Sequence, residues 1–501
     1  MGTARLGLVG LVAIGVVAIA PVWLSPVLVT TDGPSHVYNA FLGNAVRSGR
    51  QPFATYFAFA PGGIRPNQAA EFLLAWLGRL VGWPIAERAL CTVAIVATLA
   101  VLARLSAGGP LPASIALASV AGWLSQGWFL WMGFYDFALS LAGYAALVLV
   151  LRWPPTPARR LSLLVVFAAL YLTHLLTFAV GVGLAIFALG ARAMSRRERW
   201  VELAAVAPAV LLVLLEVAGG GAGAPAWADP RRQLPGLVLG DFVMSLSVWD
   251  TVAGVAIMTA VWYTVVVRLR DVRRQGLAAI DGAELYALGL LALSVIGPDQ
   301  LGEGGFVAIR LRCFGVLTFL PVVADEIGRL SPRLLGAAGA VLFLGLLGHA
   351  AAAVRLGRVA SSDVDVVDGL LTKAGAREGS WVVRRFTGYR RTQYGIAARS
   401  HLPERVAVRR GLIVLDNYEA LYEIFAVAWR GRPDWAGFAP TGGGLAVRLV
   451  PGEVRWPGPV YVIHDSGRAL EGGDPRLELG PTLSESSFAV TPVRRRGAQD
   501  P

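Results

Sequence analysis

Apolar segments long enough to cross a lipid bilayer recur along the first 355 residues of this 501-residue chain, and they constrain its fold most strongly. Hydrophobic residues make up 55% of the chain and the mean hydropathy is +0.59, values typical of a polytopic α-helical membrane protein. We therefore predict about eleven membrane-spanning helices. They cover residues 6–29, 85–105, 111–128, 134–152, 161–175, 176–193, 201–218, 249–268, 282–297, 310–328 and 334–354.

Arginine sets the predicted orientation, because cytoplasmic loops of membrane proteins are enriched in basic residues. Arginines cluster in short loops at 152–160, 192–199, 268–274 and 329–333, which share one side of the membrane with the N-terminus. This pattern predicts a multi-pass protein of the bacterial plasma membrane, with a cytoplasmic N-terminus and an extracytoplasmic tail. Because topology explains the arginines, the net charge of +12 does not indicate a nucleic-acid partner.

The composition of the chain changes after residue 355. The tail is rich in Arg, Gly, Asp and Pro, and its short apolar alternations at 411–415 and 459–463 are typical of strands. The tail is therefore predicted to be an α/β or mostly β domain outside the cytoplasm. The predicted parts are a membrane domain over 1–355 with an external loop at 30–84, a soluble domain over 356–490 and a disordered end over 491–501.

The segment Asp32-Gly-Pro-Ser-His-Val-Tyr-Asn39 carries the strongest functional candidates and directly follows the first span. Asp32 before Gly-Pro is typical of a helix N-cap, and the same carboxylate is suited to deprotonating an acceptor hydroxyl or binding a metal. His36 and Asn39 are three residues apart and share a face of the predicted helix. We predict catalytic roles for Asp32 and His36 and a substrate contact for Asn39.

This plan resembles that of the GT-C superfamily of membrane glycosyltransferases, whose relatives include protein O-mannosyltransferases and the aminoarabinose transferases of lipid A. The resemblance covers about residues 1–355: one span, Asp32 opening an external loop, Pro66-Asn67, an amphipathic helix over 71–83 in the outer interface, and Glu87-Arg88 at the next span. The motif is most similar to that of members with Asp-Gly-Pro-x-His-x-Tyr-Asn. Many members carry a second acidic residue in this loop, whereas Gly33 follows Asp32 here.

The resemblance implies an inverting transfer of a hexose or pentose from a polyprenyl-phosphate donor. The acceptor implied is a lipid, glycan or protein of the cell envelope. The family also has a second acidic position in an external loop, and Asp136, at the outer start of a span, is the candidate for it. We predict a catalytic role for Asp136. The sequence leaves open whether Asp32 and Asp136 bind a metal. If they do, the expected cofactor is a divalent cation.

Polar residues at the outer ends of later spans supply the predicted binding residues. In GT-C enzymes a late external loop and a nearby arginine hold the lipid phosphate. The resemblance therefore makes Arg310 the first candidate for phosphate binding and Arg312 the second. The alternative is that these arginines only extend their charged ends to the membrane interface. His174 lies where a long apolar stretch must turn, and it either serves function or fixes helix packing. The other predicted substrate contacts are Arg88 and Glu303.

Two other classes of function stay open. A lipid or polysaccharide transporter or flippase also needs many spans, but no internal repeat is found and the candidate charges cluster at the outer face. A non-catalytic envelope assembly protein would bind partners through the tail. Walker A, Gly-x-Ser-x-Gly and His-Glu-x-x-His motifs are absent from the sequence, which argues against ATP hydrolysis and zinc proteolysis.

Overall fold

The structure is a computed structural model. The residues it describes are 3–60, 65–105, 110–192, 195–219, 225–276, 279–301, 304–385, 392–417, 419–421, 425–430, 446–447, 459–467, 470–472 and 477–496. The chain forms two compact units. The helical unit comprises Met1–Leu24 and Cys91–Ala353, and the loop–tail unit comprises Ser25–Leu90 and Val354–Pro501. The predicted external loop thus packs with the tail as one unit.

Apolar helices build the helical unit, and each predicted span overlaps a helix, although the bounds differ. Among the described residues, seven helices are long and apolar enough to cross a membrane, and three shorter apolar helices cover Tyr135–Leu151, Leu175–Ala191 and Gly282–Ile296. The multi-pass class is therefore confirmed, while the length criterion supports seven of the predicted spans. The helices are α1 (Thr3–Leu24), α5 (Trp83–Leu105), α6 (Leu111–Ser125), α7 (Trp128–Met132), α8 (Tyr135–Leu151), α9 (Pro157–Thr173), α10 (Leu175–Ala191), α11 (Arg196–Gly219), α12 (Pro230–Leu239), η1 (Asp241–Val243), α13 (Val248–Gln275), α14 (Gly282–Ile296), α15 (Val307–Ile327) and α16 (Pro332–Lys373), with a short antiparallel pair of β2 (Ala226–Trp227) and β3 (Pro298–Gln300). The start of α5, up to Leu90, and the end of α16, from Val354, belong to the loop–tail unit.

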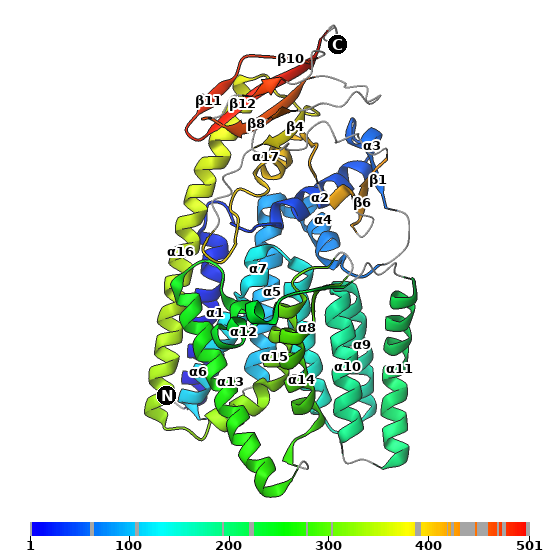
Figure 1. Cartoon of the computed structure of the whole chain (residues 1–501), viewed down its shortest axis with the longest axis vertical. Helices are drawn as coiled ribbons and strands as arrows, with labels where there is room; N and C mark the ends of the chain where they lie inside the picture. The colour runs from blue at the N-terminus through cyan, green and yellow to red at the C-terminus, as the bar shows by residue number, and fades with distance from the viewer. Residues whose placement is uncertain are drawn as a thin grey trace. The chain divides into compact units, whose positions relative to one another are not determined.

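The surface of the helical unit suits lipid. Helices α9, α10 and α11 lie side by side (Figure 1). On α11 the large apolar side chains of Leu211, Leu214 and Leu215 are exposed. Monomeric soluble proteins rarely expose such a contiguous apolar surface. A membrane environment accounts for it.

A mixed sheet forms the upper part of the loop–tail unit (Figure 1). Strands β5 (Ile413–Val414), β4 (Trp381–Arg385) and β8 (Val460–Asp465) are parallel to one another, and β12 (Phe488–Arg495) pairs antiparallel with β8. Strands β10 (Leu477–Leu479) and β11 (Leu483–Glu485) each pair antiparallel with β12. A separate parallel pair joins β7 (Ala446–Val447) to β9 (Glu471–Gly472). The strands predicted at 411–415 and 459–463 are β5 and β8. Strand β12 reaches Arg495, so the sheet continues past residue 490, where the sequence predicts disorder.

The external loop shares its hydrophobic core with the tail. The remaining elements of this unit are α2 (Gly33–Arg47), α3 (Phe53–Tyr56), β1 (Phe57–Phe59), α4 (Ala69–Val81), α17 (Leu402–Arg410), η3 (Glu419–Leu421) and β6 (Val427–Trp429). Strand β1 pairs antiparallel with β6. Buried residues of α2, such as Phe41, belong to the same core as Val406 of α17 and Ile463 of β8. This packing fixes α2 against the tail.

Helix α4 is the amphipathic helix predicted over residues 71–83. It ends at Val81, and the following Gly82 has a φ of 81°, a conformation that favours glycine. Phe72, Trp76 and Leu80 are exposed at helical spacing, whereas Glu71 is 2% exposed. The outer face of α4 is therefore apolar, as an interfacial helix requires, and its inner face carries a buried carboxylate.

Tyr38 completes the edge of the sheet at β5. Its hydroxyl donates to the Leu412 carbonyl oxygen and accepts from the Val414 amide, at 3.0 Å each. Because Tyr38 is fully buried, Tyr38→Phe leaves two main-chain groups without these partners. We expect a loss of about 1–3 kcal/mol in the free energy of unfolding, measured by denaturant titration, against less than about 0.5 kcal/mol for Tyr56→Phe on the partly exposed α3. Equal losses for the two variants would contradict this role of Tyr38.

Candidate active site

Asp32 stands at the N-cap of α2, as its sequence context predicts. Its main-chain carbonyl accepts from the amides of Ser35 and His36 at 2.9 and 3.2 Å, but its side chain makes no capping hydrogen bond. The carboxylate instead lies 3.4 Å from Nε2 of His401, with 19% of the side chain exposed. The main chain of Asp32 therefore begins α2, and its carboxylate takes no part in capping the helix.

His401 links Asp32 to a second carboxylate. Its Nδ1 lies 2.8 Å from Oε1 of Glu404, in the first turn of α17. Burial lowers the pKa of His401, but the carboxylates of Glu404 and Asp32 outweigh burial and raise it to about 9. Burial likewise opposes ionisation of Glu404, yet the His401 charge holds the pKa of Glu404 below its usual value. At neutral pH the imidazolium thus lies between two carboxylates.

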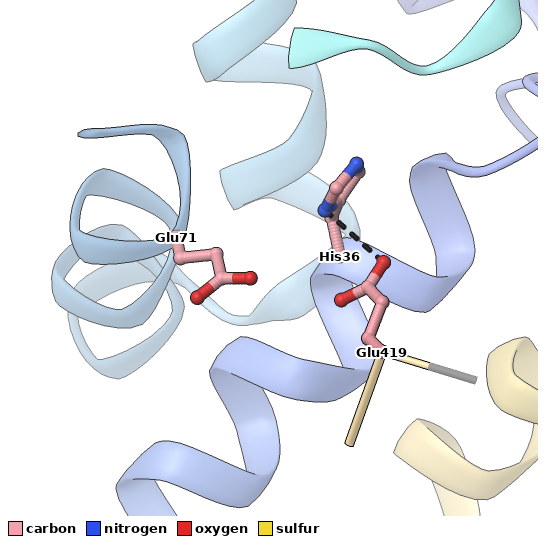
Figure 2. A group of neighbouring side chains, drawn as sticks. All are labelled: His36, Glu71 and Glu419. Carbon is pink, nitrogen blue, oxygen red and sulfur yellow. Dashed lines mark ion pairs between the residues drawn. The ribbon is translucent and has the colours of Figure 1, made fainter. Parts of the chain in front are cut away.

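A second cluster lies around His36 and contains two buried glutamates (Figure 2). His36 Nδ1 is 3.1 Å from Oε1 of Glu419 in η3, and the Glu71 carboxylate points toward this pair. Asn39 Nδ2 donates to Glu71 Oε1 at 3.0 Å. Ligand atoms of His36, Glu71 and Glu419 all lie within 4.8 Å of one another. These three residues could hold a metal ion, whereas the sequence pointed to Asp32 and Asp136.

The protonation of this cluster follows from its burial. Burial lowers the pKa of His36 to about 4, so the ring is neutral at neutral pH. Burial raises the pKa of Glu71 to about 7. Burial, together with the neighbouring carboxylates, raises the pKa of Glu419 well above its usual range. The cluster therefore favours a bound positive charge, either protons or a cation.

The predicted residues divide between the two units. Asp32, His36 and Asn39 lie together in the loop–tail unit, whereas Asp136, His174, Arg310 and Arg312 belong to the helical unit. Glu303 lies outside the described residues. His401, Glu404, Glu71 and Glu419 were not among the predicted site residues. For His401 and Glu404 the sequence does carry a signal: their spacing of three at the start of a short helix places both side chains on one face.

Phe137 brings two predicted residues of the helical unit together. The His174 ring meets its edge at a centroid distance of 5.0 Å, and the Arg310 guanidinium lies 5.2 Å from its centroid. His174 also ends α9 and caps α10, accepting from the Thr177 amide at 3.2 Å, so the predicted turn at His174 is confirmed. The packing role that the sequence left open for His174 is present in the structure.

Arg312 and Asp136 have contrasting surroundings. The Arg312 guanidinium is buried and donates to both carboxylate oxygens of Asp241, at 2.9 and 2.5 Å, and to the side chain of Gln233. This bidentate pair gives Arg312 a structural partner inside the helical unit. Asp136 is partly exposed in the first turn of α8. The Arg310 guanidinium instead lies over the rings of Phe134 and Phe137, at 5.3 and 5.2 Å from their centroids.

Arg88 lines a pocket of about 330 Å³ in the loop–tail unit, together with Trp83 and Arg405. Its guanidinium donates to the carbonyl oxygens of Ser25 and Pro26, at 2.7 and 2.8 Å. These bonds fix the chain just before Asp32. The lining also includes Glu87, whose carboxylate accepts from Arg405 at 3.1 Å.

The charge of His401 predicts a pH dependence of stability. Its pKa is about 9 in the folded chain against an ordinary value of 6.5, so its stabilisation is complete below about pH 6.5 and is lost as the pH rises through about 9. We expect the unfolding free energy of the wild type to fall toward that of His401→Gln between pH 7 and about pH 10, by at most about 3 kcal/mol, and the Tm to fall with it. Thermal unfolding of both proteins across this range tests it; parallel curves would contradict it.

The comparisons with known proteins bear on the fold. No protein-family model and no curated protein sequence matches the chain. The crystal structure of ArnT from Cupriavidus metallidurans bound to undecaprenyl phosphate matches with a TM-score of 0.53 and 12% identity, over 99% of each chain. The cryo-EM structure of the mycobacterial arabinofuranosyltransferase AftD matches 100% of this chain and 40% of its own, with a TM-score of 0.48 and 14% identity. The likeness to ArnT confirms the GT-C-like fold predicted from the sequence.

Proposed function

We propose that this chain is a membrane glycosyltransferase that moves a sugar from a polyprenyl-phosphate donor to an envelope lipid, glycan or protein at the extracytoplasmic face. The observation that carries the proposal is the Asp32 carboxylate, which is partly exposed, free of a capping role and held by His401. A partly exposed carboxylate that a second residue orients is suited to act as a general base. The ArnT structure contains undecaprenyl phosphate, which supports the choice of donor class.

In the proposed reaction Asp32 takes the proton of the acceptor hydroxyl. The hydroxyl oxygen forms a bond to the anomeric carbon of the sugar from the side opposite the lipid. The bond from that carbon to the phosphate oxygen breaks, and polyprenyl phosphate leaves with the electron pair. The configuration of the sugar is inverted, and no nucleotide is consumed. His401 orients the Asp32 carboxylate, and Glu404 fixes the His401 ring through Nδ1.

The leaving phosphate needs a cationic contact. We propose Arg310 for it, because its guanidinium is engaged by the faces of Phe134 and Phe137, whereas that of Arg312 is committed to Asp241. Guanidinium groups bind phosphate oxygens bidentately. Asp136 stays a candidate for a catalytic role, and His174 stays a candidate for a substrate contact.

Envelope analysis of a strain that lacks the gene tests the proposal. The strain is complemented with the wild type or with Asp32→Ala, and its glycans and glycolipids are compared by mass spectrometry. We expect a glycosylated species that is lost in the deletion strain, restored by the wild type and absent with Asp32→Ala. Full restoration by Asp32→Ala at equal expression would refute catalysis by Asp32 and favour the transporter or assembly alternatives.

A further inference from the structure

We propose that His36, Glu71 and Glu419 bind a divalent transition-metal ion, of which Zn²⁺ is the best fit, and that this ion ties the external loop to the tail. The site lies within the loop–tail unit and does not include Asp32. The proposal is independent of the proposed transferase activity, because it concerns how the segments around Asp32 are held.

The geometry of the three side chains suits one ion. Their ligand atoms lie within 4.8 Å of one another, so a common point exists about 2.8 Å or less from all three. Zinc bonds to His nitrogen and carboxylate oxygen are about 2.0–2.2 Å long, and side-chain shifts of about 0.7 Å would reach them. Figure 2 shows the three groups converging from separate segments. One nitrogen and two carboxylates form a ligand set that zinc accepts.

The carboxylate of Glu71 is oriented by neutral donors. Asn39 Nδ2 donates to Oε1 and the Ala426 amide donates to Oε2, at 3.0 Å each. Each oxygen keeps further lone pairs for a metal. Such outer-shell hydrogen bonds commonly orient metal-binding carboxylates. Asn39 and Ala426 thus hold Glu71 in the direction that a shared ion requires.

The charge balance around the cluster also favours a cation. Glu71 is 2% exposed and Glu419 is 0% exposed, and burying two neighbouring carboxylates is costly unless a positive charge accompanies them. The nearby imidazolium of His401 already lies between Asp32 and Glu404. A divalent ion would supply the compensation that protons otherwise provide.

The three ligands come from distant parts of the chain. His36 lies on α2, Glu71 on α4 and Glu419 in η3 of the tail. An ion shared by them would fix α2 one turn after Asp32. We therefore assign the ion a structural role: it joins α2 and α4 of the external loop to η3 of the tail.

Metal analysis of the purified full-length protein tests the proposal. The wild type, Glu419→Gln, Glu71→Gln and the exposed control Glu378→Gln are dialysed against Zn²⁺, washed by gel filtration and assayed for bound metal. We expect about one equivalent of Zn²⁺ in the wild type and the control, and at least about a tenfold loss of affinity in the two site variants. No retained Zn²⁺ in the wild type, or equal retention in all four proteins, would overturn the proposal.

Thermal unfolding gives a second readout that keeps the test valid if a variant folds poorly. Chelation should lower the Tm of the wild type by about 3 °C or more, and added Zn²⁺ should restore it. The same treatment should leave the Tm of Glu419→Gln unchanged within about 1 °C. A wild-type Tm insensitive to chelator and Zn²⁺ would count against the ion. Transfer activity is not part of either readout, so failure of the metal proposal leaves the proposed function standing.

Discussion

Asp32→Asn is expected to lower the rate of sugar transfer by about 10²–10⁴-fold while leaving the protein folded. An amide has nearly the shape of the carboxylate but cannot take the acceptor's proton. The N-cap of α2 should survive, because the Asp32 side chain makes no capping hydrogen bond and the main-chain bonds to Ser35 and His36 do not depend on it. The Asn oxygen can still accept from His401.

The measurement is the transfer rate of purified protein in detergent or liposomes, with the polyprenyl-phosphate sugar and acceptor identified by the envelope analysis. Asp365→Asn serves as the matched control, because its side chain is 66% exposed and lies in the same unit. We expect the control to keep the wild-type rate. His401→Gln should lose less activity than Asp32→Asn, since it removes the orienting group and not the base. An Asp32→Asn rate within about threefold of the wild type would contradict general-base catalysis.

The sequence predicted the helices of the helical unit because the bilayer imposes a length and an apolar composition on each span. It also predicted β5 and β8, whose apolar alternation is local. It did not predict that the external loop packs with the tail, since the pairing of β1 with β6 joins Phe57–Phe59 to Val427–Trp429 across more than 350 residues. Such pairings leave no short-range signal in a single sequence.

The large separation along the sequence also limited the prediction of the site. The sequence singled out Asp32, His36 and Asn39 because they lie on, or directly before, one short helix after the first span. His401 and Glu419 were missed because their importance depends on contacts made across the fold, at 3.4 Å to Asp32 and 3.1 Å to His36. Glu71 was interpreted as a polar residue of an interfacial helix, whereas the helix turns it inward. The exposed apolar face of α4 explains why the sequence indicated an interfacial helix, and Glu71 lies on the opposite, buried face.

Asp363→Ala is expected to cost about 3–5 kcal/mol of unfolding free energy, the largest effect we predict for a residue outside the site. Asp363 on α16 accepts from Arg399 Nε and Nη2 at 2.7 and 2.8 Å, and both residues are nearly buried. Arg399 also donates to Ser487 and stacks on Phe488 at 4.5 Å. Removing Asp363 would leave a buried guanidinium without its counter-charge.

Denaturant unfolding of Asp363→Ala and Asp365→Ala, two residues apart on α16, provides the comparison. Asp365 pairs with Arg409 at 3.3 Å on the surface, and its loss should cost less than about 1 kcal/mol. Exchanging the buried pair for apolar residues, as Asp363→Leu with Arg399→Met, should recover most of the stability lost in Asp363→Ala. Equal costs for the two single variants would contradict the assignment. Because Arg399 lies two residues before His401, unfolding of this region would also displace the group that orients Asp32, so transfer activity and stability should fall together in Asp363→Ala.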